Sequence, residues 1–126
     1  MTAGSGYALA LAVTCVVELP VYALVLTRLF GARLRTALLA GLVANAVTHP
    51  VLWLAMKPFT DGVGEYATAF VVGEVLVCAV EWLVLVVALC WFEPGRCGIG
   101  RAWLAVVSVL ANAASAAAGL ALTLLR

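Results

Sequence analysis

The stretch ATAFVVGEVLVCAVEWLVLVVALCWF, residues Ala67–Phe92, decides the fold of this chain. Its 26 residues include only two charged side chains, Glu74 and Glu81. A helix rises 1.5 Å per residue, so about 20 apolar residues match the roughly 30 Å hydrocarbon core of a bilayer. The stretch therefore predicts a transmembrane helix, with two carboxyl groups at bilayer depth.

Three more apolar stretches of similar length accompany it, and the four predicted spans are residues 7–29, 36–56, 67–92 and 102–125. The chain is 67% hydrophobic and 10% charged, with a mean hydropathy of +1.21. A soluble domain has about 25% charged residues, so these charges are too few for a water-facing surface. The expected fold is all-α, a single integral membrane domain (1–126) of four antiparallel transmembrane helices in an up-down bundle.

Basic residues are concentrated in two connections, residues 28–35 and 93–101, which together hold five arginines. The other face has Lys57 and the terminal Arg126. Cytoplasmic loops are enriched in Lys and Arg, so we expect these two connections to be cytoplasmic and both termini to be outside. The net charge of +1 argues against nucleic acid as a partner.

Each predicted span also carries polar side chains at bilayer depth, where exposure to lipid is costly. They are Glu18, Asn45, His49, Glu74, Glu81, Asn112 and Ser115. Helical spacing gives every span one polar face, and Tyr22, Thr48 and Ser108 share these faces. We therefore expect the four faces to converge in an intramembrane polar site.

Rise per residue predicts how this site is layered. We expect Glu74, His49 and Ser115 in an outer layer, Glu18, Asn45 and Asn112 near the midplane, and Glu81 nearer the cytoplasm.

Three buried carboxyls face one histidine and no buried Lys or Arg, and three ionised acids in a low dielectric would repel strongly. At least one acid should be protonated, hydrated or bound to a cation. The leading hypothesis is a small membrane protein that binds or transports protons or cations, or a subunit of a membrane complex. Glu74 and Glu81 would be the carriers, Glu18 would share the site and His49 would tune it.

Two alternatives belong to other classes. One is an intramembrane enzyme that uses His49 with Glu18 or Glu74. In its most specific form, these three residues bind a metal ion. No HExxH pattern and no nucleophile elbow is present, so the sequence favours a non-enzyme, and it identifies no cofactor. The other is a structural protein whose polar face pairs with a second copy or with another membrane protein.

The motifs Glu18-Leu19-Pro20, Asn45-Ala46-Val47-Thr48-His49-Pro50, Glu74 with Glu81, and Asn112-Ala113-Ala114-Ser115 span nearly the whole chain. Their arrangement resembles a group of uncharacterised small bacterial four-helix membrane proteins. The resemblance implies this fold and a location in a bacterial plasma membrane, and it implies no activity.

Overall fold

Four long helices make up the computed structural model, which describes residues 3–59, 62–96 and 100–124. The elements are α1 (Ala3–Arg28), α2 (Leu34–Met56), α3 (Val63–Phe92), the short 3₁₀ helix η1 (Pro94–Arg96) and α4 (Arg101–Leu124). All four α-helices are long and apolar enough to cross a membrane. The all-α four-helix prediction is confirmed, and each predicted span coincides with one helix to within a few residues.

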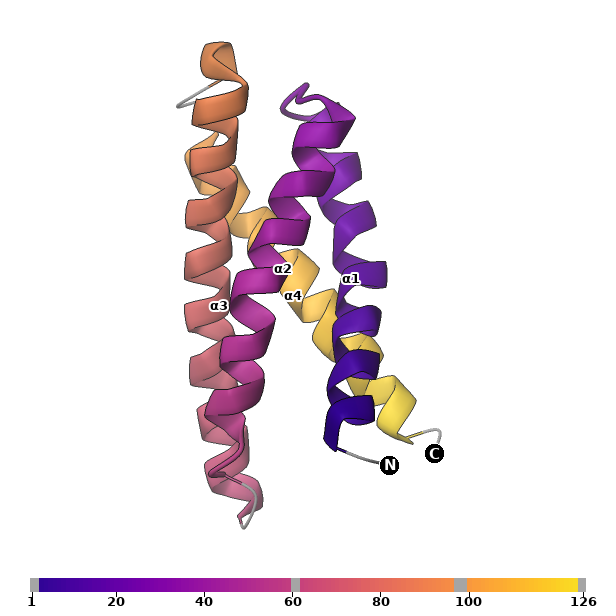
Figure 1. The fold of residues 1–126 in the computed structure, drawn as a ribbon. Coiled ribbons are helices and arrows are strands. Elements are labelled where there is room, and N and C mark those ends of the chain that lie inside the picture. Colours follow the sequence, from indigo (N-terminus) through magenta and orange to yellow (C-terminus); the bar gives the residue numbers. More distant parts are fainter. Residues whose placement is uncertain (1–2, 60–61, 97–99, 125–126) are drawn as a thin grey trace.

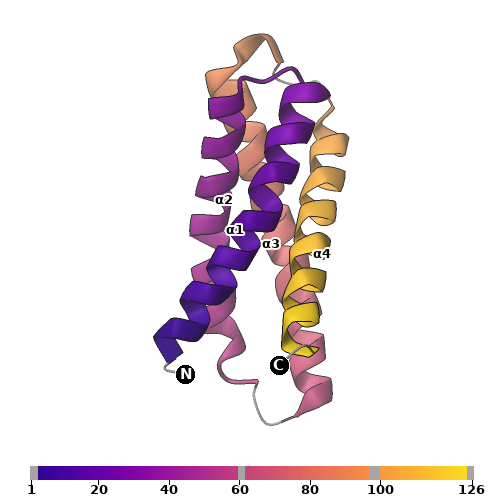
Figure 2. The same ribbon diagram turned by 90° about the vertical axis from the view of Figure 1, so that its right-hand side faces the viewer.

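The helices form an up-down ring. Helices that follow one another in sequence pack together, and α1 packs against α4 to close the ring. Among the described residues, α1 and α3 make no direct helix packing and neither do α2 and α4, so these pairs lie on the diagonals. Both termini and the α2–α3 connection lie at one end of the bundle, which we call the termini end (Figures 1 and 2). We call the opposite end the arginine end, because it carries the stretches 28–35 and 93–101 with their five arginines.

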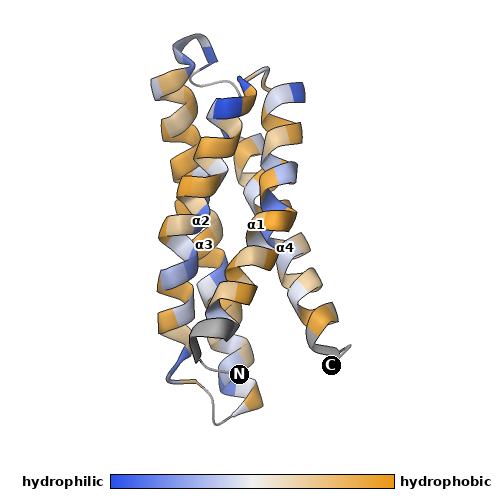
Figure 3. Ribbon diagram, turned by 45° about the vertical axis from the view of Figure 1, so that its right-hand side comes forward, coloured by the Kyte–Doolittle hydropathy of each residue, from blue (hydrophilic) through white to orange (hydrophobic). Residues whose placement is uncertain are grey.

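Helix α4 crosses the bundle at a slant (Figures 1 and 3). Its first residue lies beside Trp82 in the arginine-end half of α3, where Trp82 Nε1 donates to the Arg101 carbonyl at 2.8 Å. Further along, Ser115 of α4 hydrogen-bonds instead to Glu18 of α1. The slant leaves the termini-end half of α3 without α4 beside it.

The bundle interior has two different halves. Toward the arginine end it is apolar, and Leu26, Leu85 and Leu104 are among its fully buried side chains. Apart from Thr36 at the start of α2, the buried polar side chains are found from the middle of the bundle toward the termini end. Exposed valines and leucines cover the outer surface, as expected where lipid is the solvent, and hydrophobic colours dominate the helices in Figure 3.

Two local features of the sequence shape α1 and α2. Pro20 and Pro50 lie inside these helices without ending them, which is common in membrane helices because neighbouring groups satisfy the freed carbonyls. After α1, Gly31 adopts a φ of 61°, a left-handed conformation that suits glycine. The chain then turns so that the Ala32 N–H donates to the Leu26 carbonyl at 2.9 Å.

Candidate functional site

The carboxylate of Glu81 on α3 is the point where all four helices meet. It is 1% exposed and accepts hydrogen bonds from each of the other three helices. Tyr22 of α1 donates at 2.6 Å, Thr48 of α2 at 3.0 Å and Ser108 of α4 at 3.4 Å, and the Asn112 amide of α4 donates as well. Three of these donors reach Oε2 and Thr48 reaches Oε1, so both oxygens of Glu81 have a donor within reach.

The four donors are not equivalent. Thr48 and Ser108 each have a single hydroxyl proton, and each also lies within bonding distance of a backbone carbonyl, of Ala44 at 2.9 Å and of Cys78 at 3.1 Å. The Asn112 amide has two protons, so it can serve Glu81 and the Ser108 carbonyl together. Tyr22 and Asn112 therefore each have a proton for Glu81 that no other acceptor shares, whereas the Thr48 and Ser108 hydroxyls can donate either to Glu81 or to a backbone carbonyl.

Glu18 has a different environment, although it is also fully buried at 0% exposure. Its Oε1 accepts from the Ser115 hydroxyl at 2.6 Å, and its Oε2 has no hydrogen-bond partner. On α2, the buried atoms Asn45 Oδ1 and His49 Nδ1 also have none. The Asn45 side chain is a neighbour of the Glu18 carboxyl, and its amide nitrogen donates to the Gly41 carbonyl at 3.1 Å.

A buried acceptor without a donor costs about 1–3 kcal/mol, and more when it is charged. Glu18 Oε2 and Asn45 Oδ1 cannot satisfy each other because both are acceptors. A proton on Glu18 or a small cation beside it would supply what these atoms lack. We call the pair of Glu18 and Asn45 the Glu18 site.

Glu74 is the outermost of the three glutamates. It lies seven residues before Glu81 on the same helix, about 10 Å along the axis, in the part of α3 that α4 does not cover. Its side chain is half-buried and has no hydrogen-bond partner among the described residues, and it interacts electrostatically with both Glu18 and Glu81. Glu74 therefore stands between the buried carboxyls and the surface at the termini end.

His49 does not pair with an acid. Its ring packs against Tyr7, with the ring centroids 5.4 Å apart, and within the described ranges it makes no hydrogen bond to Glu18 or Glu74. The enzyme alternative requires a hydrogen bond between His49 and Glu18 or Glu74, and this contact is missing among the described residues. In the same part of the chain, no group of three or more His, Cys, Asp or Glu side chains is placed to hold a metal ion. The predicted metal ligands Glu18, His49 and Glu74 thus form no ready ligand set.

Hydrogen bonds join four of the predicted polar residues, Glu18, Glu81, Asn112 and Ser115, whereas His49 and Glu74 are not bonded to them in the described part of the chain, and the expected layers are wrong by about one helical turn. Ser115 bonds to Glu18 rather than lying level with Glu74 and His49, and Asn112 bonds to Glu81 rather than to Glu18. The depth count treated the helices as parallel, whereas α4 is slanted and changes its partner along its length.

Three residues that complete the site were recognised only as members of the polar faces. Tyr22 lies four residues after Glu18, Thr48 three after Asn45, and Ser108 four before Asn112. Helical spacing is therefore the signal that finds them. Their convergence on one carboxylate depends on how the helices are rotated and tilted, and spacing within a single helix carries no such information.

Comparison with protein-family models, curated proteins and solved structures gives no match to this chain. Fold and site define a small four-helix membrane protein with buried carboxyl groups at its centre. The resemblance to bacterial four-helix membrane proteins stays a prediction.

Proposed function

We propose that this protein binds a proton or a small cation at the Glu18 site, in exchange with the termini end of the bundle. The observation that carries the proposal is the pair of neighbouring buried acceptors without donors, Glu18 Oε2 and Asn45 Oδ1. Two acceptors side by side favour a ligand that carries positive charge or donates hydrogen bonds. Among the described residues, the one other buried side-chain nitrogen or oxygen without a partner is His49 Nδ1, whose ring packs against Tyr7.

The two fully buried glutamates have different roles in this proposal. Glu81 is surrounded by donors from three helices and serves as a fixed acceptor that holds the bundle together. Glu18 has one donor and one free oxygen, so it gains most from a proton or cation. This assignment revises the hypothesis in which Glu81 was a carrier, because both oxygens of Glu81 already have donors within reach.

Access is proposed to be one-sided. The half-buried Glu74 supports entry from the termini end, where it can attract a cation or relay a proton toward Glu18. Toward the arginine end, the buried leucines Leu26, Leu85 and Leu104 close the interior. Because Glu18 is fully buried, binding and release on one side require a local opening of the bundle, and transport across the membrane requires these leucines to separate as well.

The experiment is ligand-dependent melting and infrared spectroscopy of the protein purified in detergent. Adding Na⁺, K⁺ or a divalent ion should raise the melting temperature if a cation binds. If a proton binds, the infrared band of a protonated carboxyl should be present and should disappear in Glu18→Gln. A matched control is Glu65→Gln, an exposed acid in the first turn of α3, which should change neither readout.

Two outcomes would remove the proposal. In the first, Glu18→Gln keeps both the cation-dependent shift and the carboxyl band. In the second, the wild type has neither signal. If Glu74→Gln removes the signal and Glu18→Gln does not, the binding carboxyl is Glu74 and the assignment to Glu18 is wrong.

A second candidate function, a subunit of a homo-oligomer or of a larger membrane complex, is favoured by Glu74 itself. Glu74 has no partner among the described residues and lies on the part of α3 that α4 leaves uncovered. It could therefore accept a hydrogen bond from another protein's helix. The mass of the protein in nanodiscs tests the homo-oligomer, and copurification of a stoichiometric membrane partner from native membranes tests the complex. A monomer with no partner in both tests excludes this candidate.

The proposed location is the bacterial plasma membrane, with the termini outside and the arginine end cytoplasmic. The five arginines at one end support this orientation through the positive-inside rule. Single cysteines placed at Gly64 and at Gly95, in a variant whose native cysteines are replaced, test it by labelling with an impermeant reagent. Labelling of Gly95→Cys and not Gly64→Cys in intact cells would reverse the orientation.

A further inference from the structure

The arginine end carries a strong excess of positive charge that the proposed cation site does not use. Five exposed arginines gather there, namely Arg28, Arg33, Arg35, Arg96 and Arg101. A single acid, Glu93, shares that end. Such an excess next to a membrane attracts anionic groups.

Glu93 is already engaged in holding the fold. It accepts the Arg33 backbone N–H at 3.1 Å and the Thr36 hydroxyl at 3.1 Å, and so caps the start of α2, which has no side-chain cap of its own. The backbone donor and the hydroxyl hold the pKa of Glu93 below its usual value. The Arg33 guanidinium is 4.0 Å from the same carboxylate and 69% exposed, so Glu93 neutralises it only weakly.

Arg96 is held in place by the α1–α2 connection. Its guanidinium donates to the Phe30 carbonyl at the end of α1, which leaves several N–H groups of this exposed side chain for other partners. The contact fixes η1 over the α1–α2 connection. Arg33 and Arg96 thus come from different connections and are brought to one place by the packing of the chain.

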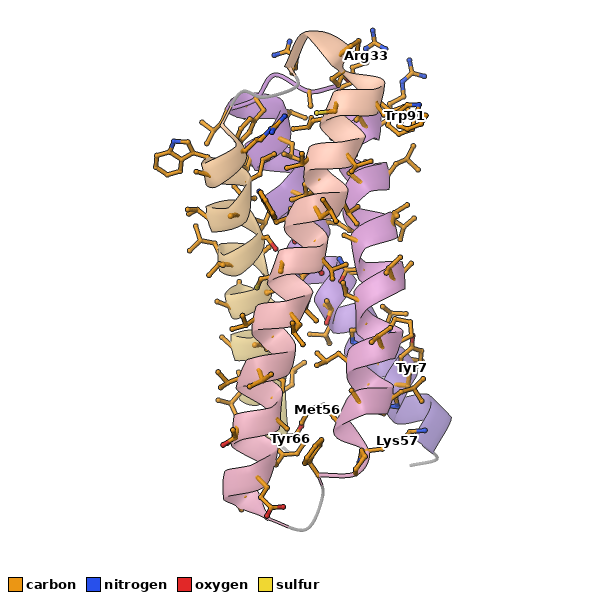
Figure 4. All side chains as sticks on the ribbon, turned by 90° about the vertical axis from the view of Figure 1, so that its left-hand side faces the viewer. Tyr7, Arg33, Met56, Lys57, Tyr66 and Trp91 are labelled. Carbon is orange, nitrogen blue, oxygen red and sulfur yellow. The ribbon has the colours of Figure 1, made fainter. Side chains whose placement is uncertain are left out.

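The two arginines line a hollow of about 420 Å³. Its other walls are Phe92, Glu93, Pro94 and Gly95, so guanidinium groups and apolar surface lie side by side. Trp91, next to the hollow, is 79% exposed, and Figure 4 shows it with Arg33 at the same end of the molecule. Exposed tryptophans at the ends of membrane helices mark the headgroup level of the bilayer.

We propose that this hollow binds the phosphate-bearing headgroup of an anionic phospholipid. Guanidinium groups pair with phosphate through two parallel hydrogen bonds, which makes arginine well suited to this ligand. Phe92 and Pro94 offer apolar contact to the glycerol backbone and the first carbons of the acyl chains. The site does not depend on the Glu18 site, from which it is separated by the apolar half of the interior.

The test measures lipid affinity of the purified protein in zwitterionic micelles by melting temperature and by native mass spectrometry. Phosphatidylglycerol should raise the melting temperature and stay bound as a discrete adduct, and phosphatidylcholine should do neither. Arg33→Gln should weaken phosphatidylglycerol binding about fivefold, as expected for one arginine near an anionic surface. This variant keeps the backbone N–H that Glu93 accepts, so it should fold.

The matched control is Arg28→Gln, which removes the same charge from the same end but lies outside the hollow. If Arg28→Gln and Arg33→Gln weaken phosphatidylglycerol binding equally, the lipid is attracted by the overall charge of this end and not by the hollow, which overturns the proposal. Equal binding of phosphatidylcholine would also overturn it. If inorganic phosphate alone gives the full stabilisation, the ligand is free phosphate rather than a lipid, and the lipid assignment is wrong.

Discussion

The Tyr22 hydroxyl of α1 donates a hydrogen bond of 2.6 Å to the Glu81 carboxylate of α3, which joins two helices that lie on a diagonal of the bundle. Both residues are fully buried, at 0% and 1% exposure. The other diagonal meets at the same carboxylate, because Thr48 of α2 and Asn112 of α4 also donate to it. One acid thus ties together helices that do not otherwise pack against each other.

Tyr22→Phe should lower the free energy of unfolding by about 1 kcal/mol, since the ring still fills its place and one buried hydrogen bond is lost. Denaturant titration in mixed micelles measures the change. In a double-mutant cycle with Glu81→Gln, the two losses should be less than additive, because both variants affect the same bond. Full additivity would mean that the contact between Tyr22 and Glu81 contributes nothing to stability.

Glu81→Gln should destabilise the bundle more, by about 2 kcal/mol. Glutamine has one acceptor oxygen, and its amide group would face donors that it cannot satisfy. The same unfolding measurement applies, with Glu65→Gln as the exposed control on the same helix. A stability equal to that of the control would show that Glu81 is not the anchor of the four helices.

Gly41→Ala should destabilise the protein by about 1–3 kcal/mol, as overpacking does in a tight core. A Cβ atom at Gly41 would lie 2.8 Å from Tyr22 Cδ2 and 3.0 Å from Leu19 Cδ2, and it would push Tyr22 away from Glu81. Gly119→Ala is the control, because nothing lies within 4 Å of its Cβ position and it is also helical. Equal melting temperatures for the two variants would contradict the close approach of α1 and α2.

Acid should loosen the arginine end through Glu93. Its folded pKa lies below the usual value of 4.5, so the ionised carboxylate stabilises the fold above pH 4.5, and this contribution is lost as the pH falls further. The melting temperature should therefore fall more steeply between about pH 6 and about pH 3 for the wild type than for Glu93→Gln. Parallel curves would show that the cap on α2 does not depend on the charge of Glu93.

The sequence allowed the four spans and their up-down order to be predicted because both depend on local properties. Length and hydropathy define a span, and short connections force neighbouring helices to run in opposite directions. The polar faces were also predictable, since Asn45 and His49, or Glu74 and Glu81, lie on one side of a helix by spacing alone. The pairing of Asn112 with Glu81 and of Ser115 with Glu18 was not, because it depends on the slant of α4.

By itself, then, the sequence determined that three glutamates lie within apolar spans, each on the polar face of its helix. Only the tertiary structure decided which of them is satisfied. Glu81 lies where Tyr22, Thr48 and Asn112 arrive from three helices, while Glu18 receives one donor and keeps a free oxygen. The physical reason is that hydrogen bonding depends on distances of a few tenths of an ångström between different helices, and these follow from helix tilt and rotation rather than from residue order.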